Sequence, residues 1–144
     1  NMTRFIMTLS HAVDLVKYAF INGNQGDLFI QKSPAVTIKI LAEALIDLYN
    51  SKSKIRQIGV RHGEKMFETL VTNEEMLATD DLGDYYRISA DNRDLNYDNY
   101  YEKGEAKREK KTDVNSNNSN LLDLEETKKI LLNLPEIKSD MNKK

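Results

Sequence analysis

The stretch LSHAVDLVKYAFINGNQGDLFIQ, residues 9–31, carries three local signals that together indicate the class of the fold. Apolar residues recur at helical spacing over 9–20, which predicts a helix with one apolar face. They are Ala12, Val13, Val16, Ala19 and Phe20. Gly23 and Gly26 then interrupt the pattern and predict a turn. The run DLFIQ, 27–31, predicts a short strand, so helix and strand alternate as in a mixed α/β chain.

The mixed pattern continues toward the middle of the chain. Thr37 is a suitable N-cap for a second helix over about 38–50. The side of this helix that we expect to be buried carries Ile38, Leu41, Ala42, Leu45 and Leu48. KIRQIGV, 54–60, alternates well enough to predict a strand, and Gly63 predicts a turn after it. EKMFETLV, 64–71, is compatible with either a strand or a helix.

Shorter elements follow. Thr72 and Glu75 have the spacing of a capping box, which predicts a short helix over 73–79. DYYRIS, 84–89, has the composition of a strand. DNRDLNYDNYYEKG, 91–104, is polar and rich in tyrosine, and we expect an ordered loop there.

The composition changes after these elements, and the change defines the expected domain organisation. We expect one folded domain over 1–104. EAKREKKTDVNSNNSN, 105–120, has almost no large apolar residue, so burial cannot offset its ordering entropy and we expect a flexible polar linker. LLDLEETKKILLNL, 121–134, predicts a final amphipathic helix that ends at Pro135. Residues 135–144 are expected to form a disordered tail.

The bulk composition excludes several classes of partner. The 144 residues make one domain at most, with 40% hydrophobic and 31% charged residues, a net charge of -2 and a pI near 5.8. Such a balanced chain has no electrostatic reason to bind nucleic acid or an anionic membrane. The absence of cysteine excludes disulfides and thiolate metal sites. Asp14 and Lys17 interrupt the first apolar stretch, so we expect no signal peptide, no membrane span and a cytoplasmic location.

No recognisable catalytic apparatus is encoded in this sequence. It has no Gly-rich dinucleotide turn, no tyrosine followed four residues later by lysine, and no nucleophile elbow. His11 and His62 lie far apart, and without cysteine or an HExxH motif they give little support to a zinc site. We therefore expect no catalytic residue and no metal site in this chain.

Two arginines and a carboxylate are the candidate binding residues. Arg4 lies shortly before the first predicted helix, and Arg61 lies between the strand predicted over 54–60 and the turn at Gly63. A guanidinium group binds phosphate oxygens through two parallel hydrogen bonds, and Glu64 could accept hydrogen bonds from sugar hydroxyls. On spacing alone, a lone arginine at a strand end is more often a solvated or salt-bridged surface residue than a phosphate ligand.

Five strings, taken together, carry a family resemblance. They are MTRF (2–5), HAVDLV (11–16), GDLFIQK (26–32), IGVRHGEKMFETL (58–70) and YYRISADNRDLNY (85–97). The chain resembles the C-terminal portion of bacterial capsular and O-antigen nucleotide-sugar enzymes. These form the UDP-N-acetylglucosamine 4,6-dehydratase/5-epimerase group of extended short-chain dehydrogenase/reductases, often labelled UDP-glucose 4-epimerase or polysaccharide biosynthesis protein. The resemblance covers about residues 1–104 and, more loosely, the helix predicted over 121–134.

The resemblance implies the fold and the partners. It implies the α/β class: the C-terminal substrate-binding part of such an enzyme, a small mixed α+β unit without the full Rossmann domain. NAD(P) and the proton-transferring tyrosine belong to that N-terminal domain, so this chain alone would bind no cofactor. The implied partners are a UDP-sugar and the Rossmann domain, joined in cis or in trans, and the full-length family is expected to be homo-oligomeric. A start at Asn1 instead of methionine fits a piece of a longer protein.

The resemblance also assigns roles to residues. Arg4 and Arg61 match arginines that contact the diphosphate of the UDP-sugar, and Glu64 matches an acidic residue that bonds the ribose. His62 stands where wider relatives commonly have proline. The resemblance does not separate a dehydratase from a 4-epimerase. A second hypothesis is a non-catalytic remnant that only packs against another chain through its apolar faces.

Overall fold

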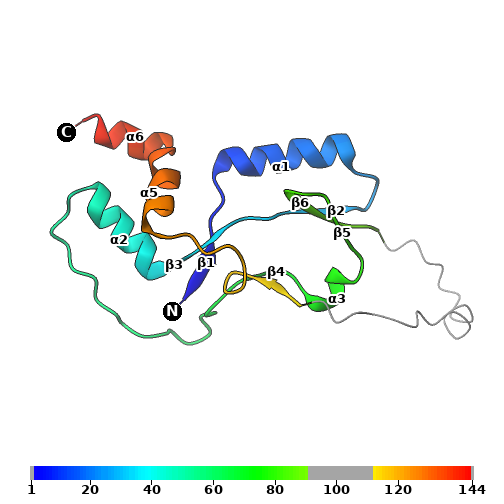
Figure 1. Cartoon of the computed structure of the whole chain (residues 1–144), viewed down its shortest axis with the longest axis horizontal. Coiled ribbons are helices and arrows are strands. Elements are labelled where there is room, and N and C mark those ends of the chain that lie inside the picture. Colours follow the sequence, from blue (N-terminus) through cyan, green and yellow to red (C-terminus); the bar gives the residue numbers. More distant parts are fainter. Residues whose placement is uncertain (1, 91–111, 144) are drawn as a thin grey trace, which may run out of the picture. The chain divides into compact units, whose positions relative to one another are not determined.

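The computed structural model describes residues 2–90 and 112–143 (Figure 1). Contacts divide the chain into two compact units, a first unit of Asn1–Leu9, Ser33–Thr69 and Asn115–Lys144, and a second of Ser10–Lys32 and Leu70–Val114. The elements are β1 (Thr3–Phe5), α1 (Leu9–Asn22), β2 (Leu28–Gln31), β3 (Ala35–Thr37), α2 (Ile38–Leu48), β4 (Thr69–Val71), α3 (Asn73–Met76), β5 (Thr79–Asp81), β6 (Tyr85–Ile88), β7 (Val114–Asn115), α5 (Leu124–Leu132) and α6 (Pro135–Met141).

Three helices build the core of the first unit. The side chain of Thr37 accepts a hydrogen bond from the backbone N–H of Ile40 and starts α2. Ala44 of α2, Leu131 of α5 and Ile137 of α6 form the buried cluster. Partly buried residues packed against it are Leu41, Leu48, Leu124, Leu134 and Met141. Both helices that cover α2 therefore come from the C-terminal end of the chain.

A small sheet in the first unit ties the two ends of the chain together. β1 pairs antiparallel with β3, with Phe5 opposite Ala35. The backbone N–H of Ala35 donates to the carbonyl of Asn120 at 2.8 Å, and the N–H of Leu122 donates to the carbonyl of Ala35 at 2.8 Å. Ala35 and Val36 are fully buried. The segment before α5 thus extends the sheet that carries β1.

The second unit is built on the antiparallel sheet β2–β6–β5. Tyr18 of α1 stacks on Tyr85 with ring centroids 4.2 Å apart and meets Phe29 edge-on at 5.7 Å. Gly23 ends α1 where a Cβ atom would lie 2.6 Å from the carbonyl oxygen of Ala19, so only glycine fits. These aromatic contacts hold α1 on the sheet. Figure 1 shows the ribbon of α1 along β2 and β6.

One side of α1 carries exposed apolar residues. None of its residues is buried, and Leu9, Phe20 and Ile21 are 82%, 85% and 81% exposed. Val13 and Val16, which belong to the apolar face predicted over 9–20, are also exposed. The helix has an apolar face as predicted, but only Ala12 and Ala19 of that face are partly buried, and its other residues are exposed.

Most predicted elements are confirmed. The helix over 9–20 is α1, the strand over 27–31 is β2, and the helix that Thr37 caps is α2. Thr72 and Glu75 form the predicted capping box of α3, which is shorter than 73–79. The strand over 84–89 is β6, and the ambiguous segment 64–71 ends in the strand β4, which forms a sheet with β7.

Two predictions need correction. Residues 54–60 form no strand; Ile55, Ile58 and Val60 are exposed, and no strand lies beside them in the described chain. The helix predicted over 121–134 is α5, which ends at Leu132, before Pro135, as predicted. Pro135 then opens a further helix, α6, because a first helical residue needs no N–H partner. The tail predicted over 135–144 is thus helical as far as Met141.

The predicted linker over 105–120 is also wrong at its C-terminal end. Val114 and Asn115 form β7, and Ser116 is fully buried. Hydrogen bonds of the Asn and Ser side chains order this polar segment in place of apolar burial; Asn115 Oδ1, for example, accepts from the N–H of Asn117 at 3.0 Å. The loop predicted over 91–104 lies outside the described residues, as do the linker residues up to 111.

Candidate functional site

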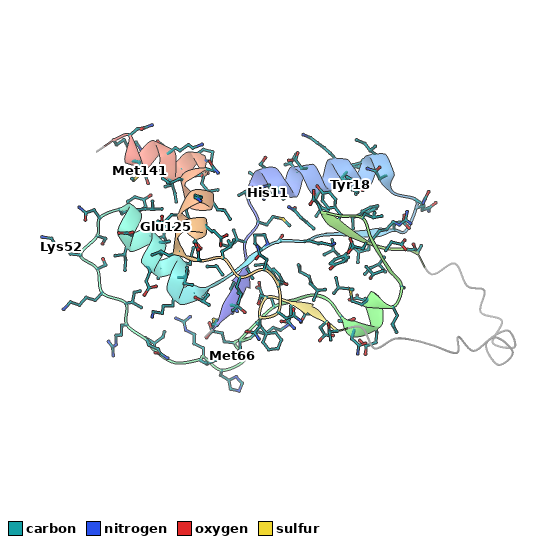
Figure 2. All side chains as sticks on the ribbon, in the orientation of Figure 1. His11, Tyr18, Lys52, Met66, Glu125 and Met141 are labelled. Carbon is teal, nitrogen blue, oxygen red and sulfur yellow. The ribbon has the colours of Figure 1, made fainter. Side chains whose placement is uncertain are left out.

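Arg4 projects from β1 and is anchored by the segment that follows the RHGE turn. Its Nη1 donates to the carbonyl of Thr3 at 2.7 Å, and its Nη2 donates to the carbonyl of Lys65 at 2.8 Å. Its Nε lies 3.7 Å from Oε1 of Glu68. The N–H of Thr3 donates to the carbonyl of Met66 at 2.9 Å; Met66 is one of the residues labelled in Figure 2. The guanidinium group is therefore tied to the residues directly after Glu64.

Arg61 and Glu64 close the turn itself. The N–H of Glu64 donates to the carbonyl of Arg61 at 3.1 Å, and the N–H of Arg61 donates to Oε2 of Glu64 at 2.9 Å. Gly63 has φ 76°, a conformation that glycine adopts without strain. Both side chains are exposed. The turn therefore fixes the backbone of Arg61 and leaves its guanidinium group in solvent.

Within the first unit, the structure thus links all three predicted residues to one stretch of chain. Arg61 and Glu64 share the turn, and Arg4 binds the carbonyl of the next residue, Lys65. Glu68 was not predicted, although it pairs with Arg4 and its Oε2 accepts from the N–H of Phe5 at 3.2 Å. No local pattern pairs a carboxylate with an arginine so distant in sequence, so the sequence holds no signal for this contact.

The shifted titratable groups of the second unit stabilise its turns. The backbone N–H of Asn24 donates to Asp27 and holds the pKa of that carboxyl below its ordinary value. Lys32 donates to Asp81 and, with the N–H of Gly83, lowers the pKa of that carboxyl. Both carboxylates accept hydrogen bonds within turns or ion pairs, which is a structural role.

Neither a metal-binding cluster nor a dinucleotide turn is found among the described residues. Over residues 2–90 and 112–143, no group of three or more His, Asp or Glu residues could hold a metal ion. The described helices are too short or too polar to cross a membrane. Gly23 and Gly26 lie between the helix α1 and the strand β2, whereas a dinucleotide turn lies between a strand and a helix. Gly23 and Gly26 therefore do not form a dinucleotide turn.

Comparison with protein families gives two matches that follow one another along the chain. The family described as polysaccharide biosynthesis protein matches residues 1–90. The family described as polysaccharide biosynthesis protein C-terminal matches residues 91–138. The first match covers more than half of the chain, and it includes Arg4, Arg61 and Glu64.

Similar proteins from Rickettsia extend this result. The chain is 55% identical over 141 residues to a UDP-glucose 4-epimerase of Rickettsia rickettsii (strain Sheila Smith), covering 98% of this chain and 41% of the relative. It is 54% identical over 141 residues to a UDP-glucose 4-epimerase of Rickettsia felis, with the same coverage. The chain thus spans about two fifths of the length of these relatives.

A solved structure shares the fold. The X-ray structure of Pen from Bacillus thuringiensis matches with a TM-score of 0.71 and 32% identity, over 93% of this chain and 38% of that one. Its agreement with the family matches confirms the predicted α/β class and the resemblance seen in the sequence. The chain belongs to the polysaccharide biosynthesis protein family of extended short-chain dehydrogenase/reductases and corresponds to a C-terminal part of it.

Proposed function

We propose that this chain is the UDP-sugar-binding, C-terminal segment of a nucleotide-sugar enzyme of polysaccharide biosynthesis. The enzyme would be of the UDP-glucose 4-epimerase or UDP-N-acetylglucosamine 4,6-dehydratase/5-epimerase type. The names of the Rickettsia relatives and of the matching families support this proposal. The single observation that carries it is the anchoring of Arg4 on Lys65, immediately after the turn that holds Arg61 and Glu64.

The proposed pyrophosphate contacts follow from the free donors. Each terminal nitrogen of Arg4 bonds one carbonyl and keeps a second hydrogen, because a guanidinium group has five N–H donors. Arg61 is exposed and offers its whole fork. Glu68 offsets part of the charge of Arg4, so the exposed Arg61 supplies much of the attraction for an anion.

The proposed ribose contact uses the other side of the turn. Oε2 of Glu64 accepts the N–H of Arg61, which holds the carboxylate in the turn. We propose that its Oε1 accepts a hydrogen bond from a ribose hydroxyl. A carboxylate has enough acceptor sites for both tasks.

Catalysis would belong to the portion of the longer relatives that this chain does not span. That portion would hold NAD(P) and the proton-transferring tyrosine, since this chain has neither a Gly-rich dinucleotide turn nor a YxxxK pair. We further propose that it covers the exposed apolar face of α1, which includes Leu9, Phe20 and Ile21. The chain alone would therefore bind UDP weakly and turn over no substrate.

Calorimetric titration with UDP tests the proposal. Losing the hydrogen bonds of one charged group costs about 1.5–3 kcal/mol, so Arg61→Ala should weaken binding by roughly ten- to a hundredfold. Arg56→Ala is the matched control, because Arg56 is also exposed but lies outside the turn. Equal effects of both substitutions would remove Arg61 from the site. Absence of UDP binding by the wild-type chain would favour the non-catalytic packing module.

A further inference from the structure

Ser116 lies at the centre of a hydrogen-bond network in the first unit and is fully buried. Its Oγ lies 2.8 Å from Oγ1 of Thr3 and 3.2 Å from the carbonyl oxygen of Thr3, to which it donates. The same Oγ accepts from the N–H of Glu68 at 2.9 Å, and the N–H of Ser116 donates to the carbonyl of Glu68 at 2.8 Å. One serine thus joins segments from both ends and the middle of the chain.

The network has a consistent hydrogen arrangement. A hydroxyl has one donor and two acceptor positions. If Thr3 Oγ1 donates to Ser116 Oγ, then the N–H of Glu68 fills the second acceptor position and the hydrogen of Ser116 points to the carbonyl of Thr3. The hydroxyl of Ser116 is then fully satisfied, as a buried polar group requires.

Both residues that Ser116 binds, Thr3 and Glu68, also hold Arg4. The carbonyl of Thr3 accepts from Arg4 Nη1 as well as from Ser116. The carboxylate of Glu68 pairs with Arg4 Nε, and the backbone N–H and carbonyl of Glu68 both bond to Ser116. Moving Ser116 would therefore move the anchors on two sides of the guanidinium group.

We propose that Ser116 is a positioning residue for the pyrophosphate site: it holds Thr3 and Glu68 so that Arg4 is oriented before the nucleotide binds. This inference rests on the function proposed above. Ser116 itself touches no ligand, because it is buried. Its contribution is preorganisation, which raises affinity by reducing the ordering that binding requires.

The test measures Arg4 directly as well as the affinity. The Nε–H resonance of Arg4 is observed by NMR in the free full chain, and UDP binding is measured by calorimetry. Ser116→Ala removes a buried hydroxyl whose partners are neutral, and losing such hydrogen bonds should weaken the affinity for UDP by about two- to tenfold. We expect the Arg4 resonance to broaden and the dissociation constant for UDP to rise by that factor.

Thr127→Val is the matched control. Thr127 is also fully buried in the first unit, and its Oγ1 donates at 2.6 Å to the carbonyl of Asp123, the N-cap residue of α5. It should lower stability without changing the Arg4 resonance or the affinity. If Ser116→Ala does not fold, Thr3→Val removes one link of the same network and should give a smaller change of the same kind.

The outcomes separate this inference from the proposed function. If Ser116→Ala changes neither the Arg4 resonance nor the UDP affinity, the inference is overturned. If Arg61→Ala nevertheless weakens UDP binding, the proposed function still stands. Equal affinity losses in Ser116→Ala and Thr127→Val would also overturn the inference, since they would report stability alone. Wild-type protein that binds no UDP would end both proposals.

Discussion

The helices α1 and α2 have the same kind of sequence pattern but different surroundings. α2 buries Ala44 against Leu131 of α5 and Ile137 of α6. α1 has no buried residue, and Leu9 and Phe20 are 82% and 85% exposed. A periodic apolar face shows that a helix needs a cover but not where the cover comes from. For α2 the cover is within this chain, and for α1 we propose that it comes from the remainder of the longer relatives.

The largest expected effect is a difference in the free energy of unfolding between a substitution in the cover of α2 and the same substitution in α1. Leu131→Ala should lower the free energy of unfolding of the first unit by about 2–5 kcal/mol, because it empties a packed site. Leu9→Ala, the same change at an exposed position, should cost within about 0.5 kcal/mol. Urea denaturation of both variants measures the difference. Equal losses would show that α1 is covered in this chain after all.

The next effect concerns the proposed cover of α1. Adding the N-terminal portion of a Rickettsia relative as a separate chain should slow amide hydrogen exchange in α1. Burying a Phe side chain is worth about 1.5–3 kcal/mol, so Phe20→Lys should weaken this association at least about tenfold. Lys17→Ala, an exposed polar position on α1, serves as control. Association that Phe20→Lys leaves intact would place the contact elsewhere.

A smaller effect tests the helices that cover α2. Asp123 accepts the N–H of Glu126 at 2.8 Å and caps α5. Asp123→Ala should lower the free energy of unfolding by about 1 kcal/mol, and Asp123→Asn should recover most of it, because both Asp and Asn are good caps. Thermal unfolding followed by circular dichroism measures both. No difference between the two variants would mean that the cap does not stabilise the cover.

The smallest effect is a pH dependence in the second unit, which contains most of α1. The folded pKa of Asp27 lies below its ordinary value of 3.8, chiefly through the N–H of Asn24. The carboxylate therefore adds stability above the ordinary value, and this contribution is lost as the pH falls through the lowered pKa. The protection of the Asn24 amide, which is its exchange rate relative to the intrinsic rate at the same pH, should fall in that acid range. Asp27→Asn should flatten this change. An identical acid profile in the variant would contradict this assignment.

The sequence predicted the elements whose signals are local. Periodicity placed α1 and α2, and the spacing of Thr72 and Glu75 placed α3. It failed for 54–60, where an alternating pattern has no neighbouring strand to pair with in the described chain. It also failed for the tail predicted over 135–144, because proline suits the start of a helix as well as the residue after its end.

The same distinction applies to the candidate site. The turn of Arg61 and Glu64 joins residues that are close in sequence, so Gly63 was enough to predict it. The anchoring of Arg4 on Lys65 and the network of Ser116 join distant segments through backbone carbonyls. Carbonyl acceptors have no residue-specific signature, so only the structure could reveal these contacts.

The proposed binding of a UDP-sugar pyrophosphate by Arg4 and the Arg61 turn has one most direct test. It is an NMR titration of the full chain with UDP and, separately, with uridine, since only UDP carries the diphosphate. We predict that UDP shifts the guanidinium resonances of Arg4 and Arg61 in one saturable transition, while uridine leaves both unchanged. Identical responses to the two ligands, or shifts confined to other residues, would contradict the proposal.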